Sequence, residues 1–432
     1  MKSVLIISPY FPPVNAADMQ RVRMSLPYFE QFGWTAEVVA VDPRYTVISR
    51  DPLLQETIPP HIKIHYVKAL NVAVTGKFGL GSIALRALPF YKRFVDRLLR
   101  KKHYDLIYFS TTQFPVCILG AHWKKKFGVP YVIDMQDPWH TDYYQDKPRT
   151  LRPKKYWFSY RLNKRLEKAT MMTVDGLISV SDTYIETLKT RYPVISGIPA
   201  ATITFGAFDA DLVIARQHAA EFRPVLATTT TNVVYVGRGG SDMHQAVSRL
   251  LSGFSLGLKE NFTLFDNIRL YFIGTSYAPK GEGEPSIMPL VSQFRLEKYV
   301  IELTDRIGFF ETLVTLDRAD ALFMPGSDAP GYTPSKIYPY LLNFKPLLAI
   351  FSAGSSALKV LREYGVPCAF DPDQASPEAV ASFLSACGSG SFKTSEYDRN
   401  AISRYSAQTL TGEQCKLFEQ VAVRHLKSKK NR

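Results

Sequence analysis

At 432 residues, 46% of them hydrophobic, the chain is too long for a single core and suits two domains of roughly 200 residues each. Its four cysteines lack CxxC or metal-ligand spacing and no run of about 18 apolar residues occurs, which argues against a disulfide scaffold, a zinc ribbon and a membrane-spanning helix. The formal net charge of +14 favours an anionic partner, but no zinc-finger spacing, RNP-like string or basic region with heptads points to nucleic acid.

Short apolar runs alternate with helical patterns along the first 200 residues. This alternation predicts a parallel sheet with crossover helices, the α/β class. The first run meets Pro9 after too few apolar residues for a signal peptide, so we expect a buried strand and a cytoplasmic protein. The runs predicted to be strands cover 3–8, 35–41, 62–67, 105–110, 130–134 and 176–180.

The loop after the first predicted strand is rich in proline and leads into a helix that carries Arg21. Ligands of open α/β sheets bind at the carboxyl ends of the strands, so Asn15 and Arg21 are candidate binding residues. The loop lacks a GxGxxG pattern, which argues against a dinucleotide.

A second candidate is Asp137, where we expect a strand to end before Pro138 and Trp139. A carboxylate at that edge is able to act as a base or to accept a hydrogen bond from a sugar hydroxyl. The alternative is an aspartate that caps the next turn. His140 is a candidate partner, although a single histidine is more often a surface or packing residue.

The positive charge lies mostly in the first half. Residues 1–200 hold 29 Lys and Arg against 16 Asp and Glu, whereas residues 201–432 hold 24 against 23. Segments 76–103 and 152–168 mix basic and apolar residues at helical spacing, which predicts either helices on acidic lipid or core helices with a charged outer face. Two such segments in one domain favour the surface role, and a merely basic surface is the alternative.

The second half repeats the strand and helix pattern after residues 210–230, whose composition predicts a linker. Gly237, Arg238 and Gly239 follow its first strand. Glycines admit a phosphate close to the backbone and an arginine is able to grip it with two N–H groups, whereas the alternative is a flexible turn. Strands are predicted near 232–236, 268–273, 299–303, 320–324, 347–351 and 366–370, and a helix from Tyr405 to about 426 precedes a basic tail expected to be disordered.

Residues 331–346 lie between two predicted core strands and carry a helix-start pattern. Thr333 and Ser335 are good N-cap types, and Pro334 suits a first turn. A helix starting here would direct its free N–H groups and the Lys336 ammonium at one spot, which makes an anion site that suits a diphosphate. The alternative is a capped helix with Lys336 in solvent.

Pro334-Ser335-Lys336, the aromatic-rich helix after it and Lys345-Pro346 before the next strand resemble the donor-binding segment of GT-B glycosyltransferases, especially the family 4-like group of bacterial polysaccharide enzymes. The proline-rich opening loop, the segment around Asp137 and the Gly237-Arg238 pair are similar to further segments of that group. The resemblance implies that Ser335 and Lys336 hold the donor's diphosphate. Gly331 and Pro339 stand where the group has its two glutamates.

The resemblance implies a GT-B fold, with two Rossmann-like domains facing each other across a cleft: 1–205 for the acceptor and 206–405 for the donor, while 406–432 crosses back as a helix and basic tail. It implies a hexosyltransferase that moves a sugar from a nucleotide-sugar donor to a glycan or lipid-linked acceptor in cell-surface polysaccharide synthesis, with retention of configuration and no metal or other cofactor. Asp137 would be catalytic. The expected donor ligands are Gly237, Arg238, Gly239, His244, Ser335 and Lys336, and the expected acceptor ligands are Asn15, Arg21 and His140.

Two alternative functions stay open. A catalytically inactive GT-B relative that acts as a binding or assembly subunit would explain the loss of both glutamates at Gly331 and Pro339. A GT-B-type sugar-nucleotide epimerase is less favoured, because its carboxylate and histidine motifs are not found. The basic first half adds the expectation of a peripheral location on acidic lipid at the inner face of the cell membrane.

Overall fold

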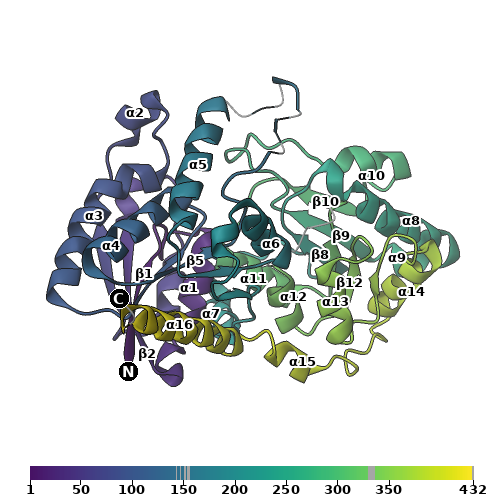
Figure 1. The fold of residues 1–432 in the computed structure, drawn as a ribbon. Coiled ribbons are helices and arrows are strands. Elements are labelled where there is room, and N and C mark those ends of the chain that lie inside the picture. The colour runs from purple at the N-terminus through teal and green to yellow at the C-terminus, as the bar shows by residue number, and fades with distance from the viewer. Residues whose placement is uncertain (143, 146, 150–151, 153–155, 329–335, 431–432) are drawn as a thin grey trace. The chain divides into compact units, whose positions relative to one another are not determined.

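The computed structural model describes residues 1–142, 144–145, 147–149, 152, 156–328 and 336–430. The chain forms two compact units, one made of Met1–Gly206 with Tyr405–Arg432 and the other of Ala207–Arg404 (Figure 1). Each unit contains a parallel sheet with helices packed on it, so the predicted α/β class is confirmed. No helix in the described part of the chain combines the length and the apolarity needed to cross a membrane.

The first unit holds a seven-stranded sheet in the order β3-β2-β1-β4-β5-β6-β7, with every neighbouring pair parallel. Its strand order reverses between β1 and β4, which is where open α/β sheets bind their ligands. The predicted strands are confirmed, and β7 at the edge was not predicted. The strands are β1 (Lys2–Ile7), β2 (Trp34–Val41), β3 (Lys63–Val67), β4 (Leu106–Ser110), β5 (Tyr131–Met135), β6 (Gly176–Ser179) and β7 (Ala200–Thr202).

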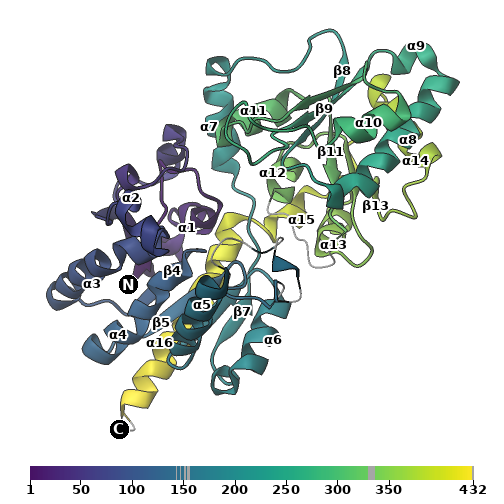
Figure 2. The same cartoon turned by 90° about the horizontal axis from the view of Figure 1, so that it is seen from above.

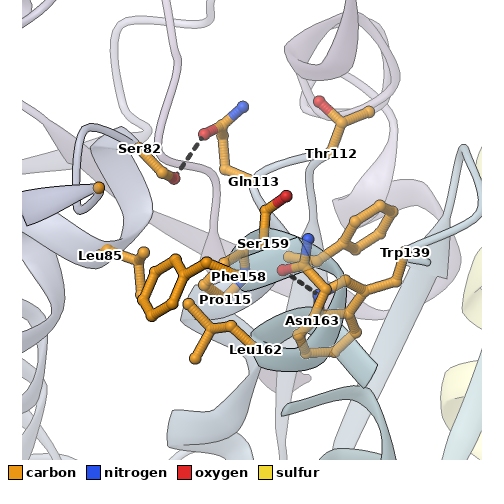
Figure 3. Close-up of a pocket in the computed structure, with 12 residues that line it drawn as sticks. Ser82, Leu85, Thr112, Gln113, Pro115, Trp139, Phe158, Ser159, Leu162 and Asn163 are labelled. Atoms are coloured by element: carbon orange, nitrogen blue, oxygen red, sulfur yellow. Dashed lines mark hydrogen bonds between the residues drawn. The ribbon is translucent and has the colours of Figure 1, made fainter. Parts of the chain in front are cut away.

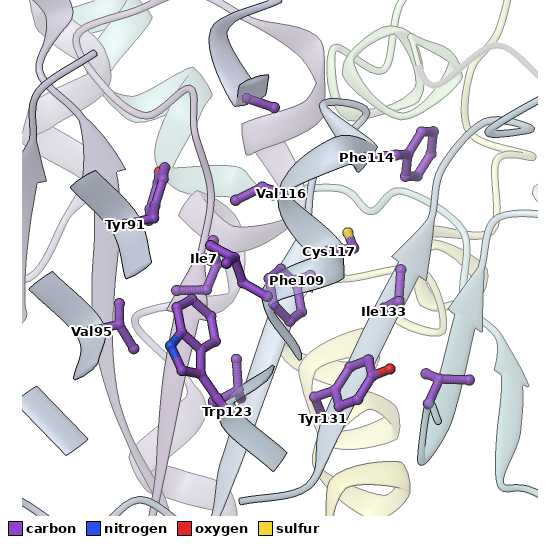
Figure 4. Close-up of a cluster of buried hydrophobic side chains, with 14 of the residues drawn as sticks. Ile7, Tyr91, Val95, Phe109, Phe114, Val116, Cys117, Trp123, Tyr131 and Ile133 are labelled. Atoms are coloured by element: carbon purple, nitrogen blue, oxygen red, sulfur yellow. The ribbon is translucent and has the colours of Figure 1, made fainter. Parts of the chain in front are cut away.

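Helices cover both faces of this sheet. On one face a buried cluster joins the strands to α3 and α4, and Trp123 stacks on Phe109 with ring centroids 6.0 Å apart (Figure 4). On the other face α16 packs, with the Phe418 ring 5.0 Å from that of Tyr108. The helices are α1 (Gln20–Ser25), α2 (Val72–Thr75), α3 (Ile83–Lys101), α4 (Ile118–Phe127), α5 (Tyr156–Met171), α6 (Asp182–Arg191) and α16 (Ala407–Lys430).

Helix α3 does not lie on a surface as an interfacial helix would. Its apolar stripe, including Ile83, Ala87, Tyr91 and Val95, is buried in the core cluster. Arg86 on the same helix is buried too and donates hydrogen bonds to three backbone carbonyls. The core alternative for segment 76–103 is therefore correct.

The second unit repeats the strand order of the first. Its six parallel strands run β10-β9-β8-β11-β12-β13, so the order reverses between β8 and β11 (Figure 2). The strands are β8 (Thr231–Val236), β9 (Ile268–Ile273), β10 (Val300–Leu303), β11 (Ala321–Pro325), β12 (Leu347–Ile350) and β13 (Ala369–Phe370). The helices are α7 (Asp209–Gln217), α8 (His244–Glu260), α9 (Phe262–Phe265), α10 (Met288–Phe294), α11 (Phe309–Arg318), α12 (Ile337–Leu342), α13 (Ser356–Glu363), α14 (Pro377–Gly388) and α15 (Arg399–Ser403).

The prediction that 210–230 is a linker was wrong for its first part. Residues 209–217 form α7, which packs on α11 and buries Leu212 and Ile214. Arg216 and Asp317 join the two helices by an ion pair of 2.8 Å. The apolar contacts of α7 outweigh the polar composition of the residues that follow it.

The prediction of a disordered C-terminal tail was also wrong as far as the chain is described. Helix α16 continues through Lys430. His425 and Lys429 donate hydrogen bonds of 2.8 and 3.0 Å to the Gly128 carbonyl, which ties the last turns to the end of α4.

Candidate functional site

At the carboxyl end of β8, the side-chain amine of Lys336 lies close to the backbone of the loop that follows the strand. The Lys336 Nζ donates a hydrogen bond of 2.5 Å to the Tyr235 hydroxyl and lies 4.3 Å from the centre of that ring. A Cβ at Gly237 would lie 2.3 Å from the same nitrogen, so glycine is required there for the amine to take this position. The Tyr235 hydroxyl in turn donates to the Arg238 carbonyl at 2.8 Å.

Helix α12 holds Lys336 at this strand end. The helix begins at Ile337, with Lys336 at its N-cap and no side-chain capping bond. The Tyr340 hydroxyl accepts from the Val236 amide at 2.8 Å, which fixes the helix to β8. Ser335 and Gly331 lie outside the described residues.

Three cations gather around this end of the sheet, and we call Arg238, Arg306 and Lys336 the cationic cluster. Desolvation by the surrounding residues, together with the positive charges of Arg238 and Arg306, lowers the pKa of Lys336 from 10.5 to about 7. Arg238 pairs with Asp242 at 2.5 Å, and this pairing lowers the pKa of that carboxyl to about 2. Arg306 is exposed and lies 4.7 Å from the Tyr277 ring centre. The cluster therefore holds more positive charge than its own carboxylate neutralises.

The glycine loop between β8 and α8 is held by a second loop. A Cβ at Gly239 would lie 2.0 Å from the Ser286 Oγ, and the His244 Nε2 lies 2.9 Å from the Ser286 carbonyl, to which it donates. The Glu302 carboxylate accepts hydrogen bonds from three consecutive amides, those of residues 286–288, at 2.8 to 3.0 Å. Gly237, Arg238, Gly239, His244 and Lys336 thus share one edge of the sheet, and their role as donor ligands stays a prediction.

The equivalent edge of the first sheet is rich in carboxylates. Asp18, buried just before α1, accepts hydrogen bonds from the Thr111 hydroxyl at 2.8 Å and the Thr112 amide at 3.0 Å. Desolvation raises the pKa of Asp18. The Gln136 amide nitrogen donates to the Asp18 carbonyl and to Asp134, so a single network links the ends of β4 and β5 to the loop after β1.

Arg21 is buried in the same network. Its Nε donates to Asp134 at 2.7 Å, and its other nitrogens donate to the carbonyls of Ile203 at 2.7 Å and Thr204 at 2.9 Å. These contacts give Arg21 a structural role that the sequence did not reveal. Asn15 is partly exposed, and its backbone N–H donates a hydrogen bond of 2.9 Å to the Ser49 carbonyl. Acceptor binding by Asn15 and Arg21 stays a prediction.

Asp137 lies beyond the end of β5 rather than at its last residue, and its side chain is exposed. Partial desolvation and the neighbouring Asp18 carboxylate raise its pKa, which suits a group that takes up a proton. His140 points elsewhere: its ring is buried, with Nδ1 3.0 Å from Glu167, and Arg191 completes this cluster. The structure supplies packing contacts for His140, and its expected role with the acceptor is untested.

A pocket of about 230 Å³ opens at this edge of the first unit (Figure 3). It lies between the start of α3, the segment after β4 and the first turns of α5. Sequence reasoning missed this pocket, as it missed Asp18 and Arg306. Asp18 and Arg306 both follow predicted strands at the ligand-binding edge, which was the one signal available for them. The lining residues are Gly79, Ser82, Leu85, Thr112, Gln113, Phe114, Pro115, Trp139, Phe158, Ser159, Leu162 and Asn163.

Comparison with known proteins gives one family and a set of shared folds. The sequence model of Glycosyltransferase Family 4 matches residues 37–203. No curated protein sequence matches the chain.

Three solved structures share the fold of this chain at low sequence identity. α,α-Trehalose 6-phosphate synthase from Burkholderia multivorans has a TM-score of 0.60 at 12% identity, with 100% of this chain and 99% of that chain covered. Anabaena HepE in complex with UDP and glucose has a TM-score of 0.56 at 16% identity and coverage of 96% and 99%. Sucrose-phosphate synthase from Thermosynechococcus elongatus has a TM-score of 0.55 at 14% identity, with 98% of this chain and 100% of that chain covered. The chain thus contains a segment that matches Glycosyltransferase Family 4, and its two parallel α/β sheets share the GT-B fold of these enzymes.

Proposed function

We propose that the protein transfers a sugar from a nucleotide-sugar donor bound by the second unit to a glycan or lipid-linked acceptor bound by the first, in cell-surface polysaccharide synthesis. The observation that carries this proposal is the cationic cluster, whose charge is only partly neutralised by Asp242. A diphosphate supplies the missing negative charge, and α8 begins shortly after Arg238 in the chain without a side-chain capping bond. The complex of HepE with UDP and glucose supports a donor of this class.

In the transfer, the bond between the anomeric carbon and the diphosphate breaks and a bond to an acceptor oxygen forms. Negative charge grows on the leaving diphosphate, where Lys336 and Arg238 stabilise it in place of a metal ion. The acceptor hydroxyl loses its proton, and Asp137, an exposed carboxylate with a raised pKa, is the proposed group that orients it or takes the proton. Retention of the anomeric configuration is part of the proposal.

The membrane part of the proposal rests on the charge of the first unit and on one helix. Residues 1–200 carry the excess of 29 basic over 16 acidic residues. Because the apolar face of α3 is used by the core, the helix available for lipid is α5, where Trp157 is 66% exposed and Arg161 and Lys164 are exposed too. An aromatic side chain next to cations suits the headgroup region of an acidic bilayer.

The test is a thermal-shift screen with UDP, GDP, CMP and ADP, combined with assays of three variants. A nucleotide at 100 times its dissociation constant should stabilise the protein by about 2.7 kcal/mol. Lys336→Ala should lose this shift, whereas Lys359→Ala, an exposed lysine on α13, should keep it. Asp137→Asn should keep the shift and lose transfer by about 100-fold or more, because only a proton-transfer group is removed.

Each outcome of this screen has a clear meaning. An undiminished shift in Lys336→Ala would contradict the donor site. A selective shift without turnover of any sugar nucleotide, tested with a membrane lipid extract as the acceptor source, would favour the inactive binding subunit instead. Nuclear magnetic resonance of the product's anomeric proton would decide between retention and inversion.

A further inference from the structure

The pocket of the first unit lies next to Asp18 and to the segment that carries Asp137. Thr112, which lines it, donates its amide to Asp18 at 3.0 Å. Trp139 also lines it and stands two positions after Asp137 in the chain. An occupant of this pocket therefore lies close to Asp18 and to the segment of Asp137.

Half of the twelve described lining residues have apolar side chains, and none of the twelve is ionisable. Phe114 and Trp139 form a stacked pair with ring centroids 5.5 Å apart. In Figure 3 the side chains of Leu85, Phe158 and Leu162 lie together on one side of the pocket. A lining without Lys, Arg, Asp or Glu does not suit a phosphate, whose binding needs charged or converging donors.

The polar groups of the lining are partly used by one another. The Ser82 hydroxyl donates to the Gln113 side-chain oxygen at 3.2 Å, and the Trp139 indole donates to the Asn163 side-chain oxygen at 3.4 Å (Figure 3). A sugar ring carries several hydroxyls, each of which needs a partner when it leaves water. The pocket therefore favours a hydrocarbon over a sugar.

Exposed apolar side chains neighbour the lining residues along the chain. Leu80, 38% exposed, follows the lining residue Gly79, and Trp157, 66% exposed, precedes the lining residue Phe158. Helix α2, shortly before Gly79 in the chain, also exposes Val72 and Val74. Exposed apolar side chains around an apolar pocket mark a binding site more than an ordinary surface.

We propose that this pocket holds the hydrocarbon chain of the acceptor, with the receiving hydroxyl directed toward Asp18 and Asp137. Since an apolar cavity of about 150 Å³ accepts benzene, a volume of about 230 Å³ accepts roughly nine carbon atoms. The inference rests on the proposed function only for the identity of the occupant as part of the acceptor. The hydrocarbon preference itself follows from the lining.

The experiment is a calorimetric titration of the full chain with alkyl β-D-glucosides below their micelle concentrations. The series runs from methyl through butyl, hexyl and octyl to decyl glucoside, so the headgroup stays constant while the chain grows. We expect affinity to rise by up to about fourfold for each methylene that enters the pocket, and to level off once roughly nine carbons are bound.

Two pocket variants and a matched control locate the binding. Leu162→Trp fills the pocket and should weaken octyl glucoside binding by tenfold or more. Phe158→Ala removes an aromatic ring from the lining at a partly exposed position, and should weaken octyl glucoside binding severalfold. Ala169→Trp adds the same indole at an exposed position of α5 outside the pocket, and should leave binding unchanged.

The results that would overturn the proposal are equally defined. Methyl glucoside binding as tightly as octyl glucoside would show a sugar pocket, and an octyl affinity that Leu162→Trp leaves intact would show that the chain binds elsewhere. The thermal unfolding of each ligand-free variant shows that it is folded, and the nucleotide thermal shift is measured on the same samples. Because that shift reports the second unit, a failed donor proposal and a failed pocket proposal are told apart.

Discussion

The two sheets share a strand order, yet their carboxyl edges carry opposite chemistry. At the first edge the buried Arg21 and Asp134 form an ion pair, and Gln136 and Ser110 donate to the same carboxylate oxygen of Asp134, whose Oδ1 has no hydrogen-bond partner among the described residues. At the second edge the cationic cluster is partly exposed, and desolvation together with the charges of Arg238 and Arg306 lowers the pKa of Lys336. The first edge thus neutralises its buried arginine within the protein, whereas the second edge keeps an excess of positive charge that suits an anionic ligand.

This difference assigns different roles to the two edges. A buried network with its partners in place is rigid and costly to disturb, so it positions the loop after β1 whether or not a ligand is bound. A cluster of like charges is unfavourable by itself and is relieved when an anion binds. We therefore expect substitutions at the first edge to act on stability and those at the second to act on binding.

The largest expected effect is at the first edge. Arg21→Ala leaves the Asp134 carboxylate buried without its cation, which should lower the free energy of unfolding by about 3–5 kcal/mol. All four tryptophans, Trp34, Trp123, Trp139 and Trp157, lie in the first unit, so urea unfolding followed by tryptophan fluorescence reports this unit separately.

The control for this prediction is an exposed ion pair in the same unit. Lys189 lies 3.2 Å from Glu186 on α6, and Lys189→Ala should change stability by about 0.5 kcal/mol at most. Equal effects of Arg21→Ala and Lys189→Ala would contradict the view of the first edge as a preformed network.

The sequence predicted the strands well and the contacts poorly, for a physical reason. Buried parallel strands are continuous apolar runs, which a sequence shows directly, and the ends of those runs located Arg238, Asp137 and Lys336. Pairings between distant residues leave no local signal: Arg21 meets Asp134, and Arg306 joins the cluster from the end of β10. The sequence therefore did not reveal the buried ion pair of Arg21.

A smaller effect is expected from the pKa of Lys336. In the ligand-free protein the Lys336 side chain has a pKa of about 7. Phosphate oxygens of a bound nucleotide would stabilise its charged form and raise that pKa. The bound state then holds more protons than the free state, so affinity must fall as the pH rises above 7, by up to about tenfold per unit. Asp242, with a pKa of about 2, stays ionised throughout this range.

Calorimetry with UDP-glucose, or with the sugar nucleotide that the screen selects, would measure this fall between pH 6 and 9. Such a donor carries no phosphate that titrates near neutrality. Lys336→Arg keeps its charge over the whole range, so its affinity should be nearly constant. A wild-type profile as flat as that of Lys336→Arg would show that the amine is already charged in the free protein.

The smallest effect tests whether the position of the amine matters as well as its charge. Gly237→Ala would place a Cβ 2.3 Å from the Lys336 Nζ and 2.7 Å from the Tyr235 hydroxyl. A lysine end is able to move away at little cost, so stability should change by less than about 1 kcal/mol while nucleotide affinity falls about fivefold. Gly197→Ala, where a Cβ meets open space, is the matched control. Unchanged affinity in Gly237→Ala would mean that the second edge attracts its ligand by charge alone, without the preformed geometry that the first edge shows.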